Sequence, residues 1–199
     1  MPWAFLKKLV DNLSHKPDPT DEWGPPTNDR PVLNLDRHSL GDIRPGDAID
    51  RVAKFGRPEN PQPTKSSDYC YYSRGFSYSA LSDDREVFEI LVVFHGAACK
   101  PEGFSDFAGE CVSGGQRITL TKEVTLDDFV QRFDLEYWRD CDDDETLLFY
   151  EFGKIEWQVE FGPDRRLRSI NMVSPPLLES AEQRKNYKVD KSWPPAGNG

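Results

Sequence analysis

An acidic run has the clearest chemical potential in this sequence: residues 134–145 read DLEYWRDCDDDE, seven acids against one base. Acids at 140, 142, 144 and 151 occupy positions 1, 3, 5 and 12 of a calcium-loop template, and carboxylate oxygens are the ligands that Ca²⁺ prefers. The template needs Gly at position 6, where this chain has Glu145. We therefore predict a solvated loop that attracts a basic partner, and no metal or other cofactor. The residues expected to contact this partner are Tyr137, Trp138, Asp142, Asp143 and Asp144.

Two predicted strands, 69–72 and 147–151, carry apolar or aromatic residues on both faces. One face of each strand must be buried against a helix. The other face either packs beneath another part of the chain or is a partner surface, because tyrosine and tryptophan are enriched at binding hot spots. We predict a partner surface that includes Tyr69, Tyr71 and Phe149, and burial of this second face remains the alternative.

The sequence contains few residues whose types and spacing would suit a catalytic site. His15, His38 and His95 lie far apart in the sequence, and His95 could pair with Cys99 only if the intervening loop folded back. The motifs of serine hydrolases, zinc proteases, P-loop proteins and dinucleotide-binding proteins do not occur. We predict no catalytic residues, and an uncharacterised hydrolase is the less favoured alternative.

The composition narrows the class of protein. A net charge of −10 and a pI near 4.8 disfavour nucleic acid as a partner, because affinity for phosphate backbones comes largely from Lys and Arg. The sequence has no apolar run of about 18 residues, so no membrane span is predicted. The N-terminal residues do not resemble a secretion signal, which favours a cytoplasmic location with reduced thiols. These thiols belong to Cys70, Cys99, Cys111 and Cys141.

A helix signal followed by three strand signals occurs twice, with an offset of 78 to 80 residues. The first copy has a helix capped by Asp47 and strands at 69–72, 76–81 and 87–95. The second has a helix capped by Thr125 and strands at 147–151, 155–161 and 167–173. In the middle strand an offset of 79 places two sets of residues on one face of a sheet. These sets are Phe76, Tyr78 and Ala80, and Ile155, Trp157 and Val159.

The predicted fold class is α+β: two tandem repeats, each a short helix packed on a three- or four-stranded antiparallel sheet, with N- and C-terminal helices added. An amphipathic helix and a proline-rich linker occupy 1–31, and repeat 1 occupies 32–96. A long loop at 97–115 leads to repeat 2 at 116–174, and a C-terminal helix and tail follow at 175–199. The N-terminal helix either docks on the body or tethers it to a larger assembly, which gives a scaffold protein as the alternative function.

The segment Gly46–Pro58, GDAIDRVAKFGRP, followed by three strands, resembles the helix-plus-meander module of the SmpA/OmlA and beta-lactamase inhibitor protein superfamily. Two tandem modules are similar to the inhibitor architecture, and the resemblance covers Leu40 to Val173. The second copy departs from it, with Asp134 and Leu135 in place of Gly56 and Arg57. The resemblance implies non-catalytic protein recognition on a sheet face, in the manner of an inhibitor or immunity protein.

Overall fold

Alternating apolar and polar residues place much of the chain in strands. The computed structural model describes residues 19–60, 66–81, 85–99, 102–133 and 136–191, and the predicted N-terminal helix lies outside these residues. The class is α+β, mostly sheet with few helices. The strands of the larger sheet are β3 (Ser66–Tyr71), β4 (Phe76–Leu81), β5 (Val87–Val93), β8 (Trp138–Cys141), β9 (Thr146–Phe152), β10 (Ile155–Phe161) and β11 (Leu167–Val173).

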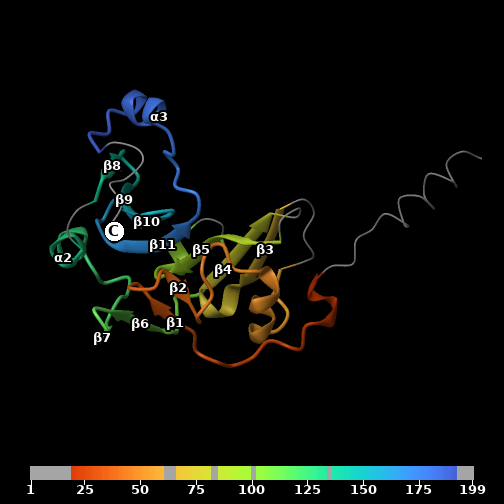
Figure 1. Cartoon of the computed structure of the whole chain (residues 1–199). Coiled ribbons are helices and arrows are strands. Elements are labelled where there is room, and N and C mark those ends of the chain that lie inside the picture. The colour runs from red at the N-terminus through yellow and green to blue at the C-terminus, as the bar shows by residue number, and fades with distance from the viewer. Residues whose placement is uncertain (1–18, 61–65, 82–84, 100–101, 134–135, 192–199) are drawn as a thin grey trace, which may run out of the picture.

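A smaller sheet and short helices complete the described chain (Figure 1). The small sheet contains β1 (Val32–Asn34), β2 (Ser39–Leu40), β6 (Glu110–Ser113) and β7 (Gln116–Ile118). The helices are η1 (Pro19–Glu22), η2 (Ile49–Phe55), η3 (Tyr72–Arg74), η4 (Gly96–Ala98), α2 (Leu126–Arg132) and α3 (Ala181–Asn186), where η marks a 3₁₀ helix. No helix among the described residues is long and apolar enough to cross a membrane.

The larger sheet has the strand order β3-β4-β5-β11-β10-β9-β8, and every neighbouring pair in it is antiparallel. The pairing of β5 with β11 joins a three-stranded meander, β3 to β5, and a four-stranded one, β8 to β11, into one continuous sheet, with Leu91 directly opposite Asn171. The small sheet has the order β2-β1-β6-β7, in which β1 and β6 are parallel. In each sheet, one pairing between strands that are far apart in the sequence joins the two halves: β5 with β11 in the larger sheet and β1 with β6 in the small one.

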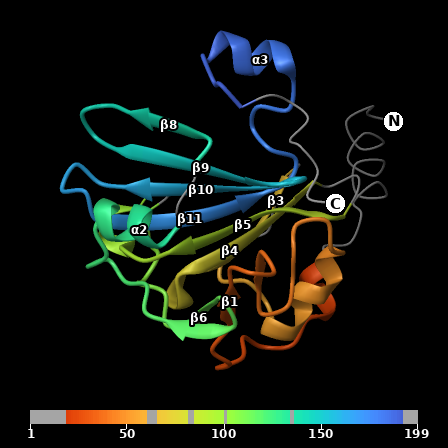
Figure 2. The same cartoon turned by 60° about the vertical axis from the view of Figure 1, so that its left-hand side comes forward.

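The main core lies on one face of the larger sheet, which we call the inner face. The small sheet and the helices η2 and α2 pack there, and Figure 2 shows β1, β6 and α2 beside the sheet. Tyr78 and Val159 of the sheet share this core with Leu33 of the small sheet and with Val52 and Phe129 of the two helices. The opposite, outer face carries many polar side chains, because successive residues of a strand point to opposite faces.

Several local predictions differ from the structure. The side chain of Asp47 does not cap η2, whose N-cap residue is Ala48, because this carboxylate accepts hydrogen bonds from the Arg44 N–H and the Arg51 guanidinium. Thr125 does cap α2, in a capping box with Asp128. The predicted loop at 97–115 contains β6 and the start of the β6–β7 hairpin, and the predicted C-terminal helix is shorter, since 174–180 is not helical.

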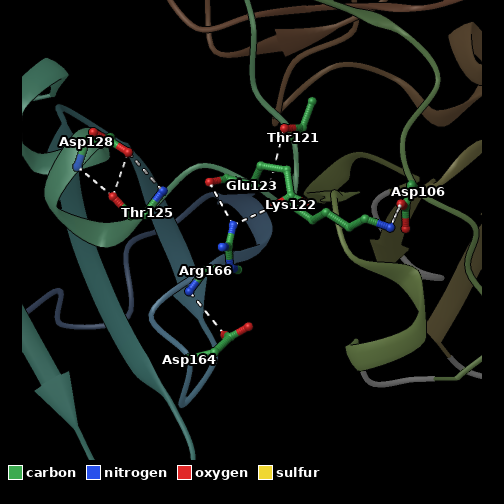
Figure 3. A network of polar contacts seen from close by, with 8 residues as sticks. All are labelled: Asp106, Thr121, Lys122, Glu123, Thr125, Asp128, Asp164 and Arg166. Carbon is green, nitrogen blue, oxygen red and sulfur yellow. Dashed lines mark hydrogen bonds and ion pairs between the residues drawn. The ribbon is translucent and has the colours of Figure 1, made fainter.

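The connection from β7 to α2 is held by polar contacts on both sides (Figure 3). Lys122 forms an ion pair of 2.9 Å with Asp106, which lies in the segment after η4. Glu123 forms a pair of 2.5 Å with Arg166 in the β10–β11 turn, and the Arg166 N–H also donates to Asp164 at 3.2 Å. These contacts fix α2 between the two sheets.

His38 links the small sheet to the larger one. Trp157 Nε1 donates a hydrogen bond of 3.1 Å to His38 Nδ1, and the imidazole lies 4.5 Å from the ring of Phe152. Burial lowers the pKa of His38, and the charge of Arg44 lowers it further, while Asp36 acts in the opposite direction. The neutral imidazole is therefore the form that the folded chain prefers.

This preference predicts a pH dependence of stability. Because the folded-state pKa lies below the unfolded value of about 6.5, the unfolded chain binds more protons between the two pKa values. We expect stability to be fully present above about pH 6.5 and to fall as the pH is lowered through this window. Urea denaturation between pH 7.5 and 5 should show a smaller decrease for His38→Asn, because asparagine tolerates the backbone φ of 50° and does not titrate there. Equal decreases in both proteins would contradict the assignment.

Candidate functional site

The structure brings most of the predicted partner-binding residues to one end of the larger sheet. Strand β8 carries Trp138 and follows Tyr137, β9 carries Phe149, and the β8–β9 turn carries Asp142–Asp144. In Figures 1 and 2, α3 lies next to β8 at this end. We call these residues, together with Tyr187 after α3, the β8 edge.

Tyr69 and Tyr71 do not belong to this site, and their prediction as an exposed surface is wrong. They are 2% and 0% exposed and lie on the inner face. The Tyr71 ring stacks on Phe76 with centroids 4.8 Å apart, and its hydroxyl donates to the Gly56 carbonyl at 2.8 Å. Burial raises the pKa of Tyr71 well above its usual value. Tyr71 thus holds the end of η2 against the sheet, and Tyr69 holds Trp23 in the segment before β1.

An aromatic stack forms the apolar part of the β8 edge. Trp138 and Phe149 are directly opposite each other on neighbouring strands, and their rings stack with centroids 4.4 Å apart. The centroid of the Tyr187 ring lies 5.3 Å from that of the Trp138 ring. Tyr187 is 57% exposed. Phe149 is itself buried, so its predicted exposure is wrong, and its role is to support Trp138.

A buried polar network lies on the same outer face. The Tyr137 hydroxyl donates a bond of 2.5 Å to the carboxylate of Glu156, which is fully buried and also accepts from Gln158 at 2.8 Å. Burial raises the pKa of Tyr137, and the bond to Glu156 raises it further, so the phenol remains a donor. The network fixes Tyr137, while Trp138 is half-buried and takes no part in it.

A second buried contact joins the C-terminal segment to β9. The guanidinium of Arg184 pairs with the carboxylate of Glu151, and both side chains are almost fully buried. Lys191 approaches the same carboxylate at 3.1 Å, and Arg184 also lies over the ring of Tyr137 at 4.9 Å. This contact places Tyr187 beside Trp138. The sequence analysis did not identify Arg184 or Tyr187. Glu151 could have indicated a buried basic partner, because it is the one charged residue of the predicted strand 147–151.

The β8–β9 turn supplies the negative charge of the site. One oxygen of Asp142 accepts bonds of 2.8 Å from the N–H groups of Asp144 and Glu145, so this acid shapes the turn. The carboxylates of Asp140, Asp143 and Asp144 are exposed and have no ion-pair partner among the described residues. The described part of the predicted acidic loop therefore belongs to the tight β8–β9 hairpin, where Asp140, Asp143 and Asp144 leave their charges without an ion-pair partner among the described residues.

Two other features, a groove along α2 and a buried cysteine cluster, are weaker candidates for a binding site. A groove of about 620 Å³ runs along α2, but its acids Glu123 and Asp128 are engaged by Arg166 and by the capping box. Cys99 is buried in a small cluster with Cys70 and Phe104, and burial raises the pKa of the Cys70 thiol. No disulfide joins the four cysteines, of which three are buried and one is exposed.

Comparison with known proteins gives only distant structural neighbours. No protein-family model and no curated protein matches the chain. A DUF4309 family protein (YjgB) from Bacillus subtilis is 20% identical over 63% of this chain and 76% of its own, with a TM-score of 0.42. A cysteine-rich secretory protein (SAV1118) from Staphylococcus aureus is 12% identical over 83% of this chain and 52% of its own, with a TM-score of 0.40. Likeness at this level carries no argument about function.

Proposed function

We propose that this chain is a non-catalytic protein-binding module, of the kind that inhibitor and immunity proteins represent, and that it contacts a basic partner through the β8 edge. The observation that carries the proposal is the position of Trp138 and Asp140 on one face of β8, beside Tyr187 and the uncompensated charges of Asp143 and Asp144. Aromatic anchors within a charged rim are typical of binding hot spots.

The edge position of β8 supports the same proposal. Strand β8 ends the order of the larger sheet, so among the described strands only β9 pairs with it. An edge strand offers free backbone N–H and C=O groups to an added strand. Acids at such an edge repel a second copy of this acidic chain and attract a basic segment. Four cysteines without a disulfide support a cytoplasmic location for this encounter.

We propose that the scaffold is a tandem repeat of a helix and a meander, as the resemblance to the inhibitor superfamily implies. Matching hydrogen bonds support this. The first helical N–H of η2 donates to the backbone carbonyl of Arg85 at 2.8 Å, and the first helical N–H of α2 donates to the backbone carbonyl of Arg165 at 2.9 Å. Both arginines have positive φ, and each forms an ion pair of 2.6 Å with an acid of the adjacent helix. These acids are Asp50 and Asp127.

Sheet registers support the repeat and revise its offsets. A register shift occurs at Ser79/Ala80 in β4 and at Glu160/Phe161 in β10, which gives an offset of 81 where the sequence suggested 79. Because the offset changes by two residues, the matched side chains still lie on the same face of the sheet. The two helices begin and end with an offset of 77, while their last core-facing residues, Phe55 and Phe133, are 78 apart, because a 3₁₀ helix has fewer residues per turn than an α-helix. The residues that face the core are the buried Ile49, Val52 and Phe55 in the first copy, and the buried Leu126 and Phe129 with the partly buried Phe133 in the second.

The binding proposal predicts a salt-sensitive partner. The tagged full-length protein should capture a basic protein from its own lysate, and calorimetry with the purified partner then gives affinities. Asp140→Asn, Asp143→Asn and Asp144→Asn together should weaken binding at least about tenfold and reduce its salt dependence. Trp138→Ala should cost about 2 kcal/mol or more. Asp142 is left intact because it shapes the turn.

A matched control separates site charge from total charge. Glu22, Glu86 and Glu102 are exposed and lie outside the β8 edge, so their joint change to glutamine removes the same charge elsewhere. This control should bind the partner as the unmodified chain does. Equal weakening by both triple variants, or full affinity after Trp138→Ala, would overturn the proposed surface.

A further inference from the structure

A hollow of about 390 Å³ lies beside the β1–β2 turn, and the residues of the acidic β8–β9 hairpin do not line it. The β1–β2 turn, the bend after β2 and the start of η2 converge on it. All of its lining residues are polar or charged: Arg37, Ser39, Asp42, Arg44, Asp47 and Arg51. We call Arg37, Arg44 and Arg51 the arginine cluster.

The three arginines differ in their pairing. Arg51 is neutralised by Asp47 at 2.5 Å, and it also donates to the Asp42 carbonyl at 2.9 Å. No acid among the described residues lies within ion-pair distance of the guanidinium of Arg37 or Arg44. Seven arginines outside the hollow have a carboxylate partner, namely Arg85, Arg117, Arg139, Arg165, Arg166, Arg168 and Arg184. What distinguishes Arg37 and Arg44 is that both line the same hollow.

Ser39 supplies an independent observation in the same hollow. This residue is 1% exposed, and its hydroxyl has no hydrogen-bond partner among the described residues. A buried hydroxyl without a partner is costly, so a group that accepts its hydrogen would be favoured here. The guanidiniums of Arg37 and Arg44 and the hydroxyl of Ser39 can thus each donate hydrogen bonds to a ligand in this hollow.

We propose that the arginine cluster binds the phosphate group of a small phosphate ester. Guanidinium groups match phosphate oxygens with two parallel hydrogen bonds, and Ser39 can donate a further one. The free carboxylate of Asp42 can accept a hydrogen bond from a hydroxyl group of the ester's organic part. A volume of 390 Å³ lies within the range of about 300–1,000 Å³ of small-ligand sites. The neighbouring acids repel an extended polyanion, so a single phosphate is favoured over nucleic acid.

Titration of the full-length protein with inorganic phosphate and with ribose 5-phosphate, followed by calorimetry, tests the proposal. Ribose 5-phosphate should bind more tightly than inorganic phosphate, and ribose alone should not bind. Arg37→Gln and Arg44→Gln should each weaken the affinity for ribose 5-phosphate about tenfold, and Arg44→Lys should do so less. Ser39→Ala should also weaken it without lowering the melting temperature of the unliganded protein.

The control is Arg117→Gln, which removes a positive charge from β7, where Arg117 pairs with Glu110 at 3.1 Å. It should leave the affinity for ribose 5-phosphate unchanged. Failure of both phosphate compounds to bind, or equal weakening by Arg44→Gln and Arg117→Gln, would overturn the site. Equal affinity for the two phosphate compounds would overturn its assignment to an ester. None of these results depends on the partner of the β8 edge.

Discussion

Gly56→Ala is expected to lower the free energy of unfolding by more than about 3 kcal/mol. Gly56 ends η2 with φ 77° and ψ −169°, a region that is essentially restricted to glycine and that costs another residue about 1–3 kcal/mol. A Cβ atom on Gly56 would lie 2.1 Å from the carbonyl oxygen of Pro25 and 2.8 Å from the Cα of Pro26. Because both contacts are with backbone, the chain before β1 would have to move.

That movement would break contacts on both sides of Gly56. Thr27 N–H donates to the Phe55 carbonyl at 3.0 Å, and Arg57 N–H donates to the Gly24 carbonyl at 2.8 Å. The same segment carries Trp23, whose ring stacks on Tyr69 at 5.4 Å. The displacement would therefore open one end of the core.

Urea denaturation with Gly24→Ala as the control measures the effect. Gly24 lies in the same segment, but a Cβ there would meet nothing within 4 Å, and its φ is not in the left-handed region. We expect this control to change stability by less than about 0.5 kcal/mol. A loss for Gly56→Ala no larger than that for Gly24→Ala would show that the segment adapts easily.

The sequence predicted strands well where both ends carried turn signals. The predicted bounds of β4, β10 and β11 equal the observed ones, because alternation and the flanking glycine, proline and aspartate residues mark them. The small sheet had no comparable signal. Strand β1 is three residues long and pairs in parallel with β6, with Leu33 opposite Cys111, so its pairing depends on residues 78 positions apart.

The prediction that Tyr69 and Tyr71 of β3 form a partner surface was wrong for a similar physical reason. A strand with aromatic residues on both faces does not itself show which face is buried. The answer came from the neighbouring strand: Tyr69 is directly opposite Tyr78, and residues opposite each other in adjacent strands share a face. Once Tyr78 is placed on the inner face, the register of the β3–β4 hairpin places Tyr69 and Tyr71 there too.

The β8 edge was predicted only in part for the same reason. Tyr137, Trp138 and the acids are close in sequence, so one hairpin brings them together. Tyr187 and Arg184 reach them across the fold, through a buried ion pair with Glu151 that no local pattern shows. Local patterns therefore indicated the charges of the site, and tertiary packing added its outer aromatic ring.

Arg184→Ala is expected to lower the free energy of unfolding by about 3 kcal/mol, because it leaves the buried carboxylate of Glu151 without its main partner. It also removes the bond of 2.9 Å from Arg184 Nε to the Leu178 carbonyl and the contact with the Tyr137 ring. The nearby Lys191 is partly exposed and can retain some of the pairing, which keeps the loss at the low end of the range for broken buried pairs.

Two variants test this cause. Lys185→Ala changes an exposed neighbour on α3 and should alter stability by less than about 0.5 kcal/mol. The double variant Arg184→Met with Glu151→Met should recover much of the loss, because apolar groups of similar volume can replace a buried ion pair. A loss below about 1 kcal/mol for Arg184→Ala would mean that the ion pair does not hold the segment.

The same variant separates stability from recognition. Release of α3 withdraws Tyr187 from Trp138, so Arg184→Ala should also weaken partner binding under conditions in which the sheet is still folded. Tyr187→Ala removes the exposed ring while leaving the ion pair intact, and it should weaken binding with little change in stability. If Arg184→Ala weakens binding and Tyr187→Ala does not, the C-terminal segment supports the β8 edge without contacting the partner. If both weaken binding, the aromatic stack itself is the contact surface.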